Sequence, residues 1–264
     1  MARAVGMDLE DGVARVTLRS PQTGNALSAR TVQDLWTALS CPEVQSSRVL
    51  VLSAEGEAFC RGMQLDGMED ERAKFTAAGE IFARCLLTLA TMPQPVICCV
   101  QGPAMGGGVA LAVACDIILG TSRATFSMPE PIMGMIPALA APFLLRRLMP
   151  GHCRRLMLSG GTIAAAEAMN VGLIDEVTDD LPRQTDTYLR RFTRMSPAAL
   201  GETKRYLNSL VNDELHARVA EALNLASEWM QRPDVRAGIV AFTEGGLPSW
   251  FSSVGRNAVA TDSH

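Results

Sequence analysis

Two hydrophobic patterns alternate along the first two-thirds of the chain. Residues 13–18, VARVTL, alternate apolar and polar side chains as a half-buried strand does, and residues 47–56, SRVLVLSAEG, predict a strand closed by a glycine turn. Residues 95–102, PVICCVQG, are almost continuously apolar and predict a buried strand. Short strands are expected within 116–121, DIILGT, and 124–129, ATFSMP. Strands therefore recur at intervals that leave room for helices between them.

Helical spacing fills those intervals. Residues 25–39, NALSARTVQDLWTAL, place apolar side chains three and four positions apart and predict a helix after the asparagine. A second helix is expected over 72–91, ending before two prolines, and residues 138–158 are expected to be helical. Residues 162–177, TIAAAEAMNVGLIDEV, predict a helix, a glycine stop and a strand.

The pattern changes after about residue 182. SPAALGETKRYLNSL begins a helix with Ser196 as its N-cap and Pro197 at its first position. A long helix over 213–231 and another after Pro233 follow. We therefore predict an α/β core over residues 1–182 and a C-terminal helical region over residues 183–264.

Composition excludes several classes of function. The 264 residues are 48% hydrophobic and 20% charged, with a formal net charge of −4, as in an ordinary globular protein with a large core. No basic stripe appears, so a nucleic acid is not an expected partner. The first residues lack the apolar core of a signal peptide, and no apolar run reaches the length of a membrane span. A cytoplasmic protein is expected.

Cysteine and histidine spacing does not favour a metal site. The seven cysteines include no CxxC pair, and the three histidines lie far apart. Buried, reduced cysteines account for this usage better than disulfides do. Only two lysines occur, Lys74 and Lys204, and the remaining basic residues are arginines, which suit carboxylate or phosphate partners.

A glycine triplet, Gly106–Gly108, separates a strand-like run from a helix-like run in QGPAMGGGVALAVACDI (101–117). Strand, glycines and helix together can offer backbone N–H groups at a helix N-terminus. No Gly-Lys-Ser/Thr follows, and three adjacent glycines are not the dinucleotide fingerprint. An anion or oxyanion site and tight packing of strand against helix both remain open.

Two further stretches could carry chemistry. AEGEAFCRGMQLDGM (54–68) is either a loop with a buried aromatic or a second glycine-assisted turn that directs an N–H into a cleft. Glu130 stands between Pro129 and Pro131 and is followed by apolar residues. Apolar surroundings would raise its pKa and suit a general base, whereas a surface glutamate at a helix start is the simpler alternative.

Taken together, these stretches resemble the crotonase (enoyl-CoA hydratase/isomerase) superfamily. NALS, AEGEAFCRGMQL, GPAMGGGVALAVACDI, ATFSMPEPIMGMIP and AEAMNVGLIDEV follow one another in the order and at about the spacing of that family, from about Gly12 to Leu247. The resemblance implies a spiral of stacked ββα units. It also implies C-terminal helices that help build a homotrimer or a dimer of trimers.

The resemblance also assigns residues. The two N–H groups that hold a thioester oxygen fall on Met63 and Gly107, and the base falls on Glu130. The second glutamate of the hydratases falls on Ala110, which cannot transfer protons, and this argues against an ordinary fatty-acid hydratase. Arg61, Gly106 and Gln64 are expected to contact substrate; many relatives have an aspartate in place of that glutamine.

One base beside such a site could serve a double-bond isomerase or a dehydratase. Decarboxylation is disfavoured, because the carboxylate of Glu130 would repel that of the substrate. The stretch 126–148 and the tail DVRAGIVAFTEGGLPSWF resemble dehydratases of polyketide β-branching cassettes. They imply dehydration of a 3-hydroxy-3-methylglutaryl group on an acyl carrier protein to the 3-methylglutaconyl thioester. Arg61 is the arginine nearest the oxyanion loop, whereas Arg146 and Arg147 are interpreted as solvated helix residues.

The resemblance implies neither a metal nor a redox cofactor, with the acyl group carried on the phosphopantetheine of coenzyme A or of a carrier protein. Three alternatives remain open. They are an enoyl-thioester isomerase, an ordinary enoyl-CoA hydratase, and a non-catalytic module that binds acyl thioesters or their carrier protein.

Overall fold

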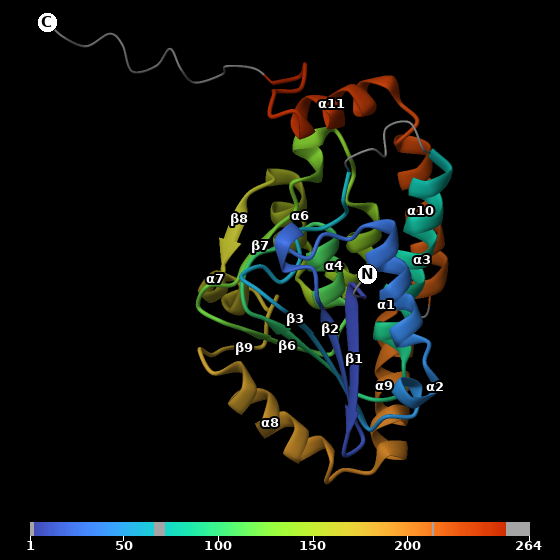
Figure 1. Cartoon of the computed structure of the whole chain (residues 1–264), viewed down its shortest axis with the longest axis vertical. Helices are drawn as coiled ribbons and strands as arrows, with labels where there is room; N and C mark the ends of the chain where they lie inside the picture. Colours follow the sequence, from blue (N-terminus) through green and yellow to red (C-terminus); the bar gives the residue numbers. More distant parts are fainter. Residues whose placement is uncertain (1–2, 66–71, 213, 252–264) are drawn as a thin grey trace, which may run out of the picture.

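Strands and helices alternate up to residue 177, and only helices follow, in the computed structural model, which describes residues 3–65, 72–212 and 214–251 (Figure 1). The strands are β1 (Val5–Glu10), β2 (Val13–Leu18), β3 (Val49–Ala54), β4 (Val96–Val100), β5 (Ala104–Met105), β6 (Ile117–Gly120), β7 (Thr125–Ser127), β8 (Thr162–Ala164) and β9 (Glu176–Val177).

The helices are α1 (Ala29–Leu39), α2 (Pro42–Gln45), α3 (Arg72–Thr91), α4 (Gly107–Val113), α5 (Ala141–Arg147), α6 (Pro150–Ser159), α7 (Ala165–Asn170), α8 (Leu181–Phe192), α9 (Pro197–Asn212), α10 (Leu215–Trp229) and α11 (Pro233–Thr243). Short 3₁₀ turns are η1 (Pro21–Thr23), η2 (Glu130–Met133) and η3 (Ala138–Ala140). Within the described residues, no helix is long and apolar enough to cross a bilayer.

The chain winds through two sheets in repeated ββα turns. The larger sheet has the order β1-β2-β3-β4-β6-β9, with β1 antiparallel to β2 and the other neighbours parallel; the smaller has the order β5-β7-β8. Thus β4, β5 and α4 form one turn of the spiral, and β6, β7 and α5 form the next. In the turn before them, β3 leads to Cys60, which pairs with Ala104 beside the smaller sheet, and then to α3. The predicted fold class is confirmed.

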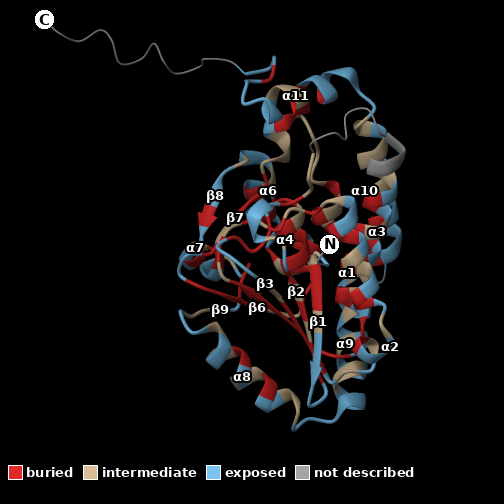
Figure 2. Ribbon diagram, in the orientation of Figure 1, coloured by how far each residue is buried: buried red, intermediate tan, exposed pale blue. Residues whose placement is uncertain are grey.

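The apolar run of β3 explains the layers on either side of the large sheet. Successive side chains of a strand point to opposite faces. Leu50 and Leu52 enter the main core, whereas Val49 and Val51 pack in a second cluster that includes Leu189 of α8. Buried residues are concentrated in the strands and on the inward faces of the helices (Figure 2). All seven cysteines are free, and six of them are buried, as predicted.

The helix expected over 138–158 is broken into η3, α5 and α6. Leu148 and Met149 have extended backbone, with ψ of 147° and 141°. Pro150 explains this break, because proline disfavours helical geometry in the preceding residue and donates no backbone hydrogen bond. The break separates α5 from α6, while η3 runs directly into α5 and lines a cavity.

The C-terminal helices return over the core. Residue 182, the expected boundary, lies in the first turn of α8, which packs on β4 and β6. Helix α10 then packs against α3 and η3, and α11 packs against η2 (Figure 1). Segments that lie far apart in the sequence therefore enclose the region around Glu130.

Candidate functional site

Gly106 lies where the chain turns from β5 into α4. Its φ is +50°, which disfavours residues with a side chain, and its N–H donates to the carbonyl of Ser127 at 2.9 Å. A Cβ placed on Gly106 would lie 2.7 Å from Oε1 of Glu130. This glycine therefore brings the start of α4 against the carboxylate.

The other two glycines of the triplet each pack so closely against a different neighbour that a side chain would not fit. A Cβ on Gly107 would lie 2.9 Å from Cδ1 of Leu27 and 3.5 Å from the ring of Phe82. A Cβ on Gly108 would lie 2.3 Å from the backbone oxygen of Cys60. The structure therefore confirms tight packing of strand against helix at the triplet, and an oxyanion site at the start of α4 stays a prediction.

Met63 and Gly107 present backbone N–H groups to the same region. Leu27 pairs in parallel with Met63 by donating to Gly62 O at 2.8 Å and accepting from Gln64 N at 3.2 Å. In this pattern the N–H of Met63 points away from Leu27. Neither Met63 N–H nor Gly107 N–H has an acceptor among the residues that the structure describes.

Gly62 brings these two loops into contact. Its φ is +84°, and a Cβ placed on it would lie 2.8 Å from Met105 O and 3.3 Å from Gly107 N. Only a residue without a side chain lets the two backbones approach this closely. Two free N–H groups at the edge of one cavity can donate to the same small anion or polarised oxygen.

Glu130 begins η2 and points inward. Its Oε2 is buried and has no hydrogen-bond partner among the described residues. Burial raises the pKa of Glu130 to about 7, although a hydrogen bond from its own backbone lowers it. The surface alternative for this glutamate is therefore wrong: the residue is a buried carboxyl that titrates close to neutrality.

A narrow cavity of about 80 Å³ joins these groups. Its described lining residues come from the loops at Met63 and Glu130 and from α3, α4, η3 and α10: Met63, Thr76, Gly79, Phe82, Gly106, Gly107, Ala110, Glu130, Met135, Ile136, Pro137, Ala138, Leu139, Ala140, Leu223, Ala226 and Ser227. Among them Glu130 is the one titratable side chain. Ala110, the position to which the resemblance assigns the second glutamate of hydratases, lines the same cavity with a methyl group.

The predicted substrate contacts divide into two groups. Gly106 lines the cavity together with Met63, Gly107 and Glu130. Arg61 is exposed, and its side chain lies over Gly24, where a Cβ would be 2.6 Å from its Cδ. Gln64 is half-buried and lies next to the cavity loop without lining the cavity.

Sequence reasoning missed the side of the cavity built by the C-terminal region. Leu223, Ala226 and Ser227 of α10 line it, and Thr76 of α3 adds a second hydroxyl. The apolar spacing of α10 signals a packed helix, but nothing local in the sequence indicates what that helix packs against.

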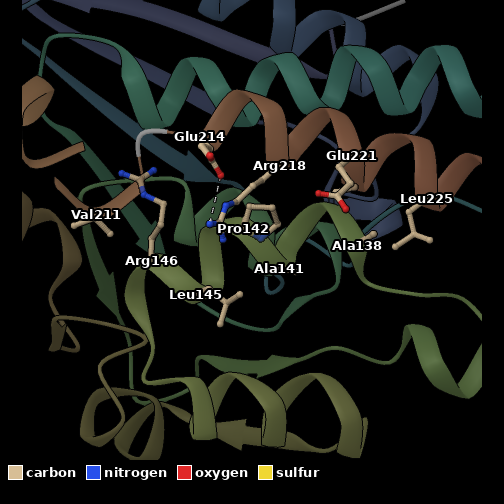
Figure 3. Close-up of a pocket in the computed structure, with 11 residues that line it drawn as sticks. Ala138, Ala141, Pro142, Leu145, Arg146, Val211, Glu214, Arg218, Glu221 and Leu225 are labelled. Atoms are coloured by element: carbon tan, nitrogen blue, oxygen red, sulfur yellow. Dashed lines mark ion pairs between the residues drawn. The ribbon is translucent and has the colours of Figure 1, made fainter. Parts of the chain in front are cut away.

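A second, more open hollow lies between α5 and α10, on the other side of η3 (Figure 3). Arg146 and Arg218 enter it together with Glu214 and Glu221, and Arg218 pairs with Glu214 at 3.7 Å. Ala138 lines both hollows and separates them. Charges of both signs partly neutralise each other there, and none of the predicted site residues lines this hollow.

Arg146 and Arg147 are not solvated helix residues, contrary to expectation. Arg147 pairs with Asp175 and donates to Leu173 O at 2.7 Å, and Arg146 bonds to Asn208. Both guanidinium groups therefore join the core to neighbouring segments.

The family model described as Enoyl-CoA hydratase/isomerase matches residues 8–253. The chain belongs to this family. YngF of Bacillus subtilis, named as an enoyl-CoA hydratase/isomerase, is 30% identical over 238 residues, covering 88% of this chain and 92% of its own. The enoyl-CoA hydratase/isomerase fold thus accounts for nearly the whole length that the structure describes.

Members of the family with different reactions resemble the chain to similar degrees. The bacillaene synthase dehydratase PksH of Bacillus subtilis is 25% identical over 251 residues, covering 94% of this chain and 96% of its own. Human enoyl-CoA delta isomerase 2 is 28% identical over 233 residues, covering 84% of this chain and 58% of its own. A crystal structure of a polyketide biosynthesis enoyl-CoA hydratase, pksH, from Bacillus subtilis superposes with a TM-score of 0.85 at 24% identity, covering 94% and 99% of the two chains. The reaction must therefore be inferred from the site.

Proposed function

We propose that the chain dehydrates a 3-hydroxyacyl thioester, with Glu130 as its single acid–base group. The observation that carries the proposal is one buried carboxyl, with a pKa raised to about 7, in a cavity where Ala110 replaces the second acid. A base of that pKa is about half ionised at neutral pH, so it can both accept a proton and give it up again.

Backbone donors would stabilise the charge that forms on the thioester oxygen. Met63 and Gly107 line the cavity that Glu130 enters, and their N–H groups have no acceptor among the described residues. Removal of the α-proton places negative charge on the carbonyl oxygen, and each aligned donor contributes roughly 3–4 kcal/mol to such a transition state. Backbone N–H groups do not titrate, so they can donate whatever the protonation state of the side chains.

The same carboxyl can pass the proton that it took from the α-carbon to the departing hydroxyl. Glu130 takes the α-proton, the electrons of that C–H bond form the Cα=Cβ double bond, and the β-hydroxyl leaves. The protonated Glu130 gives its proton to the departing hydroxyl, which becomes water. Base and acid then lie on one face of the substrate, so the elimination is syn, and Ala110 does not need to supply a proton.

For the substrate, we propose a 3-hydroxy-3-methylglutaryl group carried on phosphopantetheine, with an acyl carrier protein as partner. The likeness to PksH, named as a bacillaene synthase dehydratase, supports dehydration as the reaction. The acyl group itself rests on the resemblance of residues 126–148 to dehydratases of polyketide β-branching cassettes. The described lining of the cavity contains neither arginine nor lysine, so the distal carboxylate would be bound outside that lining. The 3-hydroxy-3-methylbutyryl thioester lacks only the distal carboxylate. Comparing kcat/KM for the two thioesters measures how much that carboxylate contributes to recognition.

Mass spectrometry of the acyl thioester tests the proposal. Wild-type protein should remove one water from the 3-hydroxy-3-methylglutaryl thioester, loaded on a carrier protein or on coenzyme A, and Glu130→Gln should not. An unchanged mass with the wild-type protein on both carriers would refute the dehydratase and leave two alternatives, an isomerase and a module that binds the acyl group without converting it.

A second candidate is an enoyl-thioester isomerase. The same single carboxyl can move a proton from the α-carbon to the γ-carbon, and the likeness to human enoyl-CoA delta isomerase 2 supports it. Conjugation of a 3-enoyl thioester, followed by ultraviolet absorption, distinguishes it from the dehydratase. An ordinary enoyl-CoA hydratase is the weakest alternative, because the resemblance gives such hydratases a second glutamate at the position where this chain has Ala110.

A further inference from the structure

No side chain among the described residues holds the carboxyl of Glu130. Its Oε2 is buried without a hydrogen-bond partner, and its Oε1 lies against Gly106 at the start of α4. The described part of the cavity lining contributes no other titratable or charged group. The direction of this carboxyl is therefore set by the backbone of η2, which begins at Glu130.

Two indole N–H groups hold the backbone just after Glu130. Nε1 of Trp229, the last residue of α10, donates to Gly134 O at 2.8 Å. Nε1 of Trp250 donates to Ile132 O at 3.3 Å. Both acceptors are main-chain carbonyls of η2 and its C-cap, so each bond acts on backbone geometry.

Glycines allow this close approach. A Cβ on Gly134 would lie 2.6 Å from Cη2 of Trp250, and a Cβ on Gly238 of α11 would lie 2.1 Å from the same atom and 2.8 Å from Met133 O. The ring of Trp250 is therefore wedged between η2 and α11. Trp229 packs in the same small cluster as Met133.

We propose that Trp229 and Trp250 are positioning residues that fix the turn from which Glu130 enters the cavity. Neither tryptophan touches the reacting atoms. The C-terminal region thereby takes part in catalysis through two backbone carbonyls. This inference rests on the proposed function, because it takes Glu130 as the base.

Tryptophan-to-phenylalanine variants test the inference, since they keep an aromatic ring and remove only the N–H donor. Trp229→Phe and Trp250→Phe should each lower kcat by about three- to tenfold, as expected for one lost hydrogen bond, with KM within twofold of wild type. Trp36→Phe, a half-buried tryptophan of α1 packed on the main core, is the matched control and should leave both constants unchanged.

An infrared titration separates this inference from the proposed reaction. Protein labelled with ¹³C-carboxyl glutamate is titrated, and subtracting the Glu130→Gln spectrum isolates one carboxyl. Loosening η2 should admit water and move the midpoint of that titration from about 7 toward the ordinary glutamate value in both tryptophan variants, but not in Trp36→Phe. If the wild-type protein turns over no thioester, the proposed function fails and this titration still tests the positioning role.

Wild-type kcat and an unmoved midpoint in a folded Trp229→Phe, Trp250→Phe double variant would overturn the inference. Circular dichroism melting checks folding. Trp250 is 42% exposed, so its variant is expected to fold even where the Trp229 variant does not, and it then carries the test alone.

Discussion

Gly108 illustrates how a single atom would disturb the site. The oxygen that its Cβ would meet, at 2.3 Å, belongs to the backbone of Cys60 and cannot rotate away. The start of α4, with the N–H of Gly107, would have to shift away from the loop that holds the N–H of Met63.

Gly108→Ala should therefore lower the free energy of unfolding by about 3 kcal/mol, the upper end of ordinary overpacking costs. Gly151→Ala is the control, because nothing lies within 4 Å of the added Cβ in α6, and alanine should be neutral or stabilise that helix by up to about 1 kcal/mol. Urea unfolding measures both. Equal stability of the two variants would contradict the packing described for the triplet.

The buried carboxyl of Glu130 makes the free energy of unfolding depend on pH. Burial raises its pKa to about 7 from 4.5, so the folded protein holds this proton more tightly than the unfolded chain does. The stability contributed by the protonated group is fully present below about pH 4.5 and is lost as pH rises through 7. At pH 8 the buried carboxylate costs about 3 kcal/mol.

Glu130→Gln should accordingly stabilise the protein by about 1–3 kcal/mol at pH 8, and the gain should nearly vanish at pH 5. Thermal unfolding of both proteins at the two pH values checks this. A pH-independent difference, or a destabilised glutamine variant at pH 8, would mean that the carboxyl is solvated in the folded state.

At this scale the sequence predicts some site residues and not others. Glu130 and Gly107 were predicted from the order of the motifs in which they stand, and the structure brings both to one cavity. Ala226 and Ser227 are ordinary residues of an amphipathic helix, and only tertiary packing brings them within reach of Glu130. The apolar neighbours of Glu130 in the chain left a buried and a surface carboxyl as alternatives, and tertiary packing, with α10 lining the cavity, decides for burial.

Helix α9 is joined to the core through one of the two lysines. Nζ of Lys204 donates to Leu89 O at 3.3 Å, to Gln94 O at 3.2 Å and to Asp116 Oδ2 at 2.6 Å. These bonds satisfy a carbonyl in the last turn of α3 and tie the entry of β4 to α9. The side chain of Lys204 is 11% exposed, so the interaction is largely shielded from solvent.

Lys204→Met should destabilise the protein by about 2 kcal/mol, because the partly buried carboxylate of Asp116 keeps only the Val96 N–H and two carbonyls lose this donor. Arg205→Met, one residue further along α9, removes the ion pair between Arg205 and Glu202. Both of these side chains are more than 60% exposed, so the loss should cost less than about 1 kcal/mol of stability. Guanidinium unfolding of both variants measures the contrast. Equal costs would contradict the role given to Lys204.

Hydrophobic periodicity predicted most of the helices and strands. Local interactions explain where the structure differs from those predictions. The helix expected from residue 25 begins only at Ala29, because Leu27 first pairs with Met63 and Ser28 caps the helix by accepting from Thr31 N at 3.0 Å. Strand β1 was not predicted, although Asp11 and Gly12 both have positive φ, as a type I′ hairpin turn requires. An Asp-Gly pair between alternating runs was the available signal.

At the scale of the whole molecule, an apolar stripe on α9 stands uncovered in a single copy. Leu207, Leu210 and Val211 are each more than half exposed and lie three and four residues apart. Exposed patches of this kind mark contacts with other protein chains. They support the proposal that the chain assembles as a trimer or a dimer of trimers.

Sedimentation equilibrium should therefore give three or six times the chain mass of 28.3 kDa. Leu210→Arg should shift the protein toward the monomer, whereas Leu9→Arg, at a half-exposed position on β1, should leave the assembly intact. A monomeric wild-type protein, or an assembly indifferent to Leu210→Arg, would contradict this use of α9.

Exchange of the substrate α-proton tests the central claim most directly, because it reports Glu130 and the N–H donors whatever the enolate does next. Incubating the protein in D₂O with an acyl thioester that lacks a β-hydroxyl, and following the mass of the acyl group, measures it. Wild-type protein should introduce deuterium at the α-carbon, and Glu130→Gln should slow exchange at least a hundredfold. Exchange at the wild-type rate in a folded Glu130→Gln variant would remove Glu130 from the role of base.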